Sequence, residues 1–114
     1  MVKEFAFWLE SIVEDDPLAD EVDVIVFKVN QNGGYYYLEM FGFEKEPNFC
    51  KESFRPLEAQ HFNITKLKNI NETLFEFRIK TMIDEAFNSQ ILKREFFKRQ
   101  IFLWFNKLEF LFLV

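Results

Sequence analysis

The sequence predicts a two-layer α+β domain in which two helices cover a four-stranded, mainly antiparallel sheet. Two pairs of apolar, strand-like runs predict the sheet, and the first pair is joined by an Asn-Gly turn. An amphipathic stretch precedes each pair and predicts a helix. The expected order is helix, hairpin, long connection, helix, hairpin. A chain of 114 residues has the size of one domain, so we expect a single unit over 1–114.

The first helix is expected over residues 3–14. Its apolar residues follow the i, i+3, i+4, i+7, i+8 stripe of an amphipathic helix: Phe5, Trp8, Leu9, Ile12 and Val13. Phe7 falls off that stripe, and because it alternates with Phe5 and Leu9 a strand remains the alternative. The helix is expected to end at Asp15-Asp16-Pro17, since the residue before a proline disfavours the α region.

The first hairpin is expected over Val22–Phe43. Asn32-Gly33 suits a two-residue type I′ turn, because both central positions of that turn need positive φ. The turn would place three pairs on one face: Val29 opposite Tyr36, Phe27 opposite Leu38, and Ile25 opposite Met40. The other face is also largely apolar, so these strands should be covered on both sides or lie within a larger sheet.

A long connection, Glu44–Asn69, follows the hairpin. It has two prolines and no sustained hydrophobic period, with a short strand or turn expected around Phe62–Leu67. Connections of this length often carry function. This one holds the only cysteine, Cys50, and the only histidine, His61.

The second helix is expected over residues 73–90. Thr73 and Glu76 fit a capping box. One helical face gathers Phe75, Ile79, Met82, Ile83 and Ala86. Alternation over 75–81 leaves a strand as the alternative. Residues 91–98 are assigned to no element, because their apolar pairs recur every five residues.

The second hairpin is expected over 99–105 and 108–114, with Asn106-Lys107 as its turn. This turn would place Phe105 opposite Leu108 and Leu103 opposite Phe110. Both faces are again apolar, as expected for strands that pack beneath helices.

The net charge of −5 disfavours a nucleic-acid-binding protein and suits a basic protein partner. The N-terminus lacks the layout of a signal peptide, and no window reaches the roughly 18 uncharged apolar residues of a membrane span. A lone cysteine allows no internal disulfide. These features predict a cytoplasmic protein without membrane contact. The 17 phenylalanines are interpreted as an aromatic core, with an association surface as the alternative.

No pattern of catalytic or metal-binding residues is recognisable, and no cofactor is predicted. Cys50 and His61, oriented by Glu58, would form a nucleophile and base if they came within hydrogen-bond reach, which makes a small enzyme one alternative. A zinc site needs about four ligands, more than this pair supplies. The single basic cluster contains Lys93, Arg94, Lys98 and Arg99, and is interpreted as an exposed stretch that flanks a strand rather than as a nucleic-acid site.

A further set of residues resembles a known group. Pro17-Leu18 follows the first helix, Glu21-Val22 leads into a strand that carries Phe27, and a Tyr-x-Leu-Glu-x-x-Gly stretch spans Tyr36 to Gly42. This arrangement resembles small acidic bacterial proteins of the polymorphic-toxin immunity type. The resemblance implies a protein-binding role, and it implies no catalytic residues.

The function predicted is therefore non-enzymatic binding of another protein, with a basic toxin as the immunity-like case. Acidic residues expected to face that partner flank the first hairpin: Glu14, Asp15, Asp16, Asp20, Glu21, Asp23, Glu44 and Glu46. A structural homo-oligomer that pairs edge strands or buries aromatic residues is a further hypothesis.

Overall fold

The computed structural model of the chain describes residues 1–45, 47 and 61–114. In chain order the elements are α1 (Val2–Asp15), β1 (Val24–Asn32), β2 (Tyr35–Phe43), β3 (Phe62–Asn63), the 3-10 turn η1 (Thr65–Leu67), α2 (Glu72–Ala86), α3 (Gln90–Glu95), β4 (Gln100–Phe105) and β5 (Lys107–Leu113). The prediction of an α+β fold is confirmed. In the described part of the chain the sheet has five strands and three helices are present, so the expected counts of four and two are wrong.

The sheet is mixed, with the strand order β3-β2-β1-β4-β5. The two predicted hairpins, β1–β2 and β4–β5, lie side by side because β1 pairs with β4 in parallel. All other neighbours are antiparallel. The extra strand, β3, is only two residues long and extends the sheet beside β2, within the region where a short strand or turn was expected.

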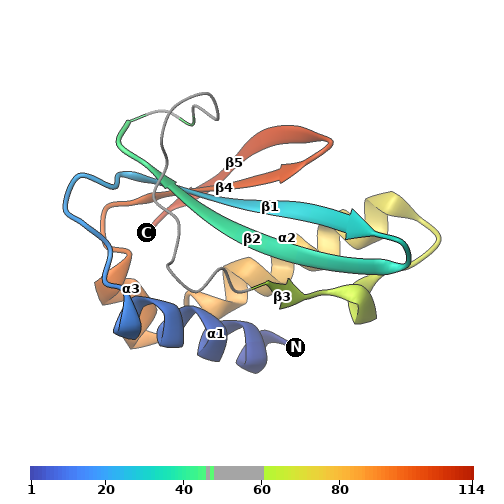
Figure 1. Cartoon of the computed structure of the whole chain (residues 1–114), viewed down its shortest axis with the longest axis horizontal. Coiled ribbons are helices and arrows are strands. Elements are labelled where there is room, and N and C mark those ends of the chain that lie inside the picture. Colours follow the sequence, from blue (N-terminus) through green and yellow to red (C-terminus); the bar gives the residue numbers. More distant parts are fainter. Residues whose placement is uncertain (46, 48–60) are drawn as a thin grey trace.

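The three helices lie on one side of the sheet (Figure 1). Phe5 and Leu9 of α1 and Phe75 of α2 belong to the same buried cluster as the central strands, whose contribution is Ile25, Phe27, Leu38, Met40, Ile101 and Leu103. A second, smaller cluster lies on the opposite face and consists of Val24, Val26, Phe41 and Phe43, with Phe102 and Trp104 beside it. No helix in the described part of the chain contributes to this second cluster.

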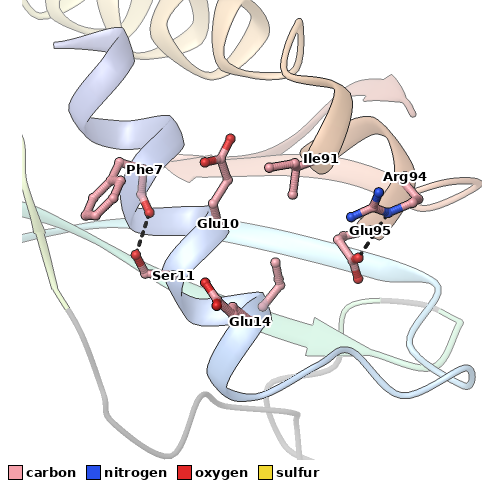
Figure 2. A pocket seen from close by; sticks show the side chains of 8 residues that line it. Phe7, Glu10, Ser11, Glu14, Ile91, Arg94 and Glu95 are labelled. Carbon is pink, nitrogen blue, oxygen red and sulfur yellow. Dashed lines mark hydrogen bonds and ion pairs between the residues drawn. The ribbon is translucent and has the colours of Figure 1, made fainter.

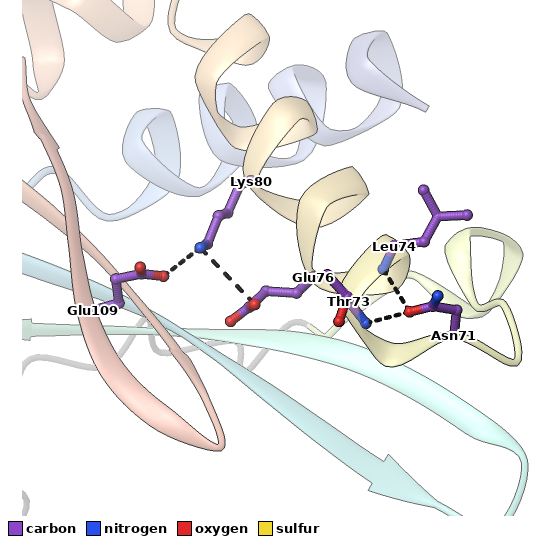
Figure 3. Close-up of polar contacts among 6 residues, drawn as sticks. All are labelled: Asn71, Thr73, Leu74, Glu76, Lys80 and Glu109. Carbon is purple, nitrogen blue, oxygen red and sulfur yellow. Dashed lines mark hydrogen bonds and ion pairs between the residues drawn. The ribbon is translucent and has the colours of Figure 1, made fainter.

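The helix ends differ from the predicted ones in part. α1 matches its prediction to within one residue at each end. The predicted capping box of α2 is wrong: Asn71 is the N-cap, and its side-chain oxygen accepts from the N–H groups of Thr73 at 2.9 Å and Leu74 at 3.3 Å (Figure 3). The prediction that this helix runs to residue 90 is also wrong. α2 stops at Ala86, and Ser89 caps a separate helix, α3, by accepting from Leu92 N–H.

The first hairpin forms, but its register is shifted. Gly33-Gly34 is the turn rather than Asn32-Gly33, so Asn32 pairs with Tyr35 and Phe27 pairs with Met40. Gly33 has φ +64°, and it is the one glycine with positive φ in the described chain, which matches a type II′ turn rather than type I′. The shift amounts to two residues across the pair. It therefore keeps every side chain on its predicted face.

The second hairpin forms, but between its turn and a bulge at Ile101/Phe102 the pairing is one residue off the predicted register, and this slip matters more. Of the two predicted turn residues only Asn106 takes positive φ, at +63°, so Phe105 pairs with Lys107 and Leu103 pairs with Glu109. Asn tolerates positive φ better than Lys does, which explains why Asn106 rather than Lys107 takes this conformation. The slip carries Glu109 to the helix side of the sheet. Lys80 of α2 meets it there and lies 4.0 Å from Glu76 as well (Figure 3).

Candidate functional site

The acidic band, which comprises Glu14, Asp15, Asp16, Asp20, Glu21, Asp23 and Glu44, gathers around the start of β1. Glu14 and Asp15 close α1, and Asp16 is its C-cap. The others lie in the loop that follows and just after β2, and all are exposed except Asp16, which is half-buried. Glu46 was predicted to belong to this band but lies outside the described residues.

The sheet joins the two acidic segments. Asp23 N–H donates to Phe43 O at 3.0 Å, one residue beyond the last pair of the β1–β2 ladder. Glu44, which follows Phe43, is thereby placed beside the loop between α1 and β1. Two acidic segments that are separate in the sequence are therefore adjacent at Asp23 and Glu44.

Arg99 holds the backbone of this loop. Its guanidinium donates to Val22 O at 2.6 Å, to Ala19 O at 3.0 Å, and to Glu95 O at 2.8 Å in α3. Gln100 N–H donates to Asp23 O at 2.9 Å, and Val22 itself is buried. Asp20, Glu21 and Asp23 thus project from the part of the loop, residues 19–23, whose backbone these hydrogen bonds hold.

The rest of the basic cluster is spread over α3 and the turn after it. Arg94 lies 3.4 Å from the Glu95 carboxylate, and Lys98 takes φ +65° with its ammonium 5.6 Å from the Phe97 ring centre. Phe97 is exposed. The contacts of Arg99 with three carbonyls support the structural interpretation of this cluster.

A groove of about 400 Å³ lies between α1 and α3 and adjoins the acidic band (Figure 2). Its lining is Phe7, Glu10, Ser11, Val13 and Glu14 from α1 and Ile91, Arg94 and Glu95 from α3. Glu10 accepts a hydrogen bond from Ser89 Oγ at 2.7 Å, which ties the two helices together. Sequence reasoning missed this groove. The available signal was Phe7, the aromatic residue off the buried stripe of α1.

The proposed pairing of Cys50, His61 and Glu58 falls largely outside the described residues, because only His61 belongs to them. The His61 ring stacks on Tyr37 with centroids 4.2 Å apart. Its Nε2 lies 4.0 Å from the Glu39 carboxylate, which also accepts from Asn30 at 2.7 Å. In residues 1–45, 47 and 61–114, no three His, Cys, Asp or Glu side chains are grouped as a metal ion would require. No helix of the same residues has the length and apolar character needed to cross a membrane.

The chain was also compared with known proteins. No protein-family model, no curated protein and no solved structure matches the chain.

Proposed function

We propose that this chain is a cytoplasmic, non-enzymatic protein-binding module whose acidic band faces a basic partner. The observation that supports the proposal is the adjacency of two exposed acidic segments at Asp23 and Glu44, beside a loop backbone that Arg99 holds. The likeness of the sequence to immunity proteins of toxin systems supports the same role, with a basic toxin as the partner.

An acidic surface would affect both the rate and the specificity of association with a basic protein. A surface that gathers charge of one sign speeds the encounter with an oppositely charged protein and disfavours partners of like charge. The fixed loop backbone reduces the ordering cost of binding. The net charge of −5 reinforces the local field rather than opposing it.

A retention experiment with two matched variants tests the proposal. The immobilised protein is exposed to an extract of its source cells at about 50 mM and about 300 mM salt, a change that shortens the screening length about 2.5-fold. We expect a basic protein to be retained at low salt and released at high salt. Asp20→Asn with Glu21→Gln should reduce retention. The control, Asp84→Asn with Glu85→Gln, neutralises another adjacent Asp-Glu pair on the exposed part of α2 and should not.

Retention that ignores salt, or an equal loss in both double variants, would show that the acidic band is not the binding surface. Encounter with the partner would then have to use another face of the molecule.

Self-association is a second candidate function, and β5 favours it. β5 has a neighbour on one side only in the described sheet. Leu108, Phe110 and Leu113 of this strand are 41%, 52% and 62% exposed. An apolar edge strand offers unpaired backbone groups to a second strand. A second copy of the chain could add its own β5 there.

Sedimentation velocity separates this candidate from the first. Phe110→Lys should convert a dimer to a monomer, because it places a charge at the centre of the edge. Phe77→Lys, at a similarly exposed phenylalanine of α2, should leave the dimer intact. A wild-type protein that stays monomeric at high concentration eliminates self-association.

A further inference from the structure

We propose that the groove between α1 and α3 receives one large apolar side chain of the basic partner, with Lys or Arg residues on either side of it. This inference rests on the proposed function and specifies how the partner is recognised. It places the anchoring contact at the groove, next to the acidic band rather than within it (Figure 2).

The apolar part of the groove comes from Phe7 and Ile91, one on each helix. Phe7 is 70% exposed and Ile91 is 44% exposed, so both keep apolar surface that a partner would remove from water. A single exposed phenylalanine is ordinary on a protein surface. Phe7 and Ile91 line this groove from separate helices, with Glu10 between them (Figure 2). Apolar anchors that dock in such pockets dominate binding at protein interfaces.

The charges around the groove select the occupant. Glu10, Glu14 and Glu95 contribute three carboxylates against one guanidinium, that of Arg94. Arg94 is engaged by Glu95 at 3.4 Å, whereas the Glu14 side chain makes no hydrogen bond or ion pair within the described residues. Glu14 belongs both to the groove and to the acidic band. A cationic segment could therefore continue from one surface to the other, while nucleic acid would be repelled by both.

The groove is formed before any partner binds. Ser89 Oγ donates to Glu10 while Leu92 N–H donates to the same hydroxyl, so one serine caps α3 and links it to α1. Leu92 and Phe96 are fully buried beneath α3 and anchor it to the core. Fixed walls reduce the entropy cost of docking, which favours a specific contact over diffuse charge attraction.

A synthetic peptide tests the inference directly. The probe is a fluorescent amphipathic peptide of about 14 residues, built from Leu and Lys, with an Ala-and-Lys peptide of equal charge as its control. Binding is followed by fluorescence anisotropy at low salt. We expect the Leu peptide to bind about tenfold more tightly than the Ala peptide, because leucine covers more of the apolar surface of the groove than alanine does.

Two matched pairs of variants locate the contact. Phe7→Ser should weaken binding of the Leu peptide about tenfold, while Phe77→Ser, at a phenylalanine 63% exposed on α2, should change it less than about twofold. Glu14→Lys should weaken it about fivefold, and Glu85→Lys much less. Both glutamates are exposed and stand second from the end of their helices, so the change in charge is equal. Ile91→Ser repeats the apolar test from α3 if Phe7→Ser proves poorly folded by circular dichroism.

Three results would overturn the inference: no binding of the Leu peptide, equal affinity for the Leu and Ala peptides, or equal effects of the Phe7 and Phe77 variants. Each of these leaves the retention experiment on Asp20 and Glu21 unaffected. Failure of the groove and failure of the acidic band are therefore told apart.

Discussion

At the scale of single residues, Arg99 shows how a charged side chain acts through the backbone. It belongs to the basic cluster of the sequence, yet its planar guanidinium donates to three carbonyl oxygens. Those carbonyls lie in the loop after α1 and in α3, so one side chain joins the α3 region to a loop whose Ala19 is 80 positions from Arg99 in the sequence. The fork of donors in arginine suits this task, which the single ammonium of lysine cannot perform.

Replacement of Arg99 should therefore cost stability. We expect Arg99→Ala to lower the free energy of unfolding by about 1–3 kcal/mol, because partly buried carbonyls lose their donors. Arg99→Lys should recover only part of the loss. Arg94→Ala is the control: the Arg94 side chain is 73% exposed, and its removal should change stability by less than about 0.5 kcal/mol. Urea denaturation measures all three, and equal effects of the two alanine variants would contradict the role of Arg99.

At the scale of elements, the sequence predicted the helices and strands whose apolar residues recur at regular spacing. It missed the turn position and the short helix, which depend on contacts between residues distant in the sequence. The stripe of α1 and the two faces of β1 and β2 were predictable from residue spacing. The position of the turn was not predictable, because Asn32-Gly33 and Gly33-Gly34 both suit a two-residue hairpin turn. The packing of the strands determines which of the two registers forms. α3 was missed because a six-residue helix carries little periodicity.

The candidate site also has a part that the sequence predicted and a part that it did not. The acidic residues were visible in the sequence, and their position around the start of β1 followed from the predicted hairpin. The groove was not predictable, because it exists only where α3 packs beside α1. The signal for α3 was Ser89, a good N-cap residue whose side-chain partner, Glu10, lies 79 positions away.

The turn of the first hairpin gives a clean test of its register. A Cβ atom added to Gly33 or Gly34 would meet nothing within 4 Å, so backbone conformation alone decides the cost. Gly33→Ala should lower the free energy of unfolding by about 1 kcal/mol, because φ is +64° at this position. Gly34→Ala should be neutral or slightly stabilising, since alanine restricts the unfolded chain. Equal destabilisation by both variants in urea titrations would instead indicate a type I′ turn.

At the scale of the whole molecule, the two ends of the sheet carry different features. α3 lies at the end of the molecule where α1 finishes and β1 and β4 begin (Figure 1). The groove and the acidic band belong to that end, because α1, α3 and the loop before β1 supply their residues. The turn of the first hairpin is at the opposite end. Between them lies an aromatic core, and eight of the phenylalanines in the described part of the chain are buried. This distribution favours the core interpretation of the phenylalanine-rich composition, although four phenylalanines in the described part of the chain are exposed.

The aromatic core should therefore set the stability of the entire protein. Phe27 lies on the central strand β1, is fully buried, and meets Phe5 of α1 edge to face with ring centres 5.5 Å apart. Phe27→Ala should cost about 3–5 kcal/mol, because it removes a large buried side chain and leaves a cavity between sheet and helix. Phe27→Leu should cost less, since leucine refills part of that space.

Phe77→Ala is the matched control for this test, because Phe77 is 63% exposed and its removal creates no cavity. A cost of about 3–5 kcal/mol is a large share of the roughly 5–15 kcal/mol typical of a domain, so Phe27→Ala should shift the urea midpoint strongly or leave the chain unfolded. Its circular dichroism should lose helical and strand signals together, because α1 and β1 share the cluster that contains Phe27. A loss below about 1 kcal/mol, or one equal to that of Phe77→Ala, would contradict a core that unites the helices with the sheet.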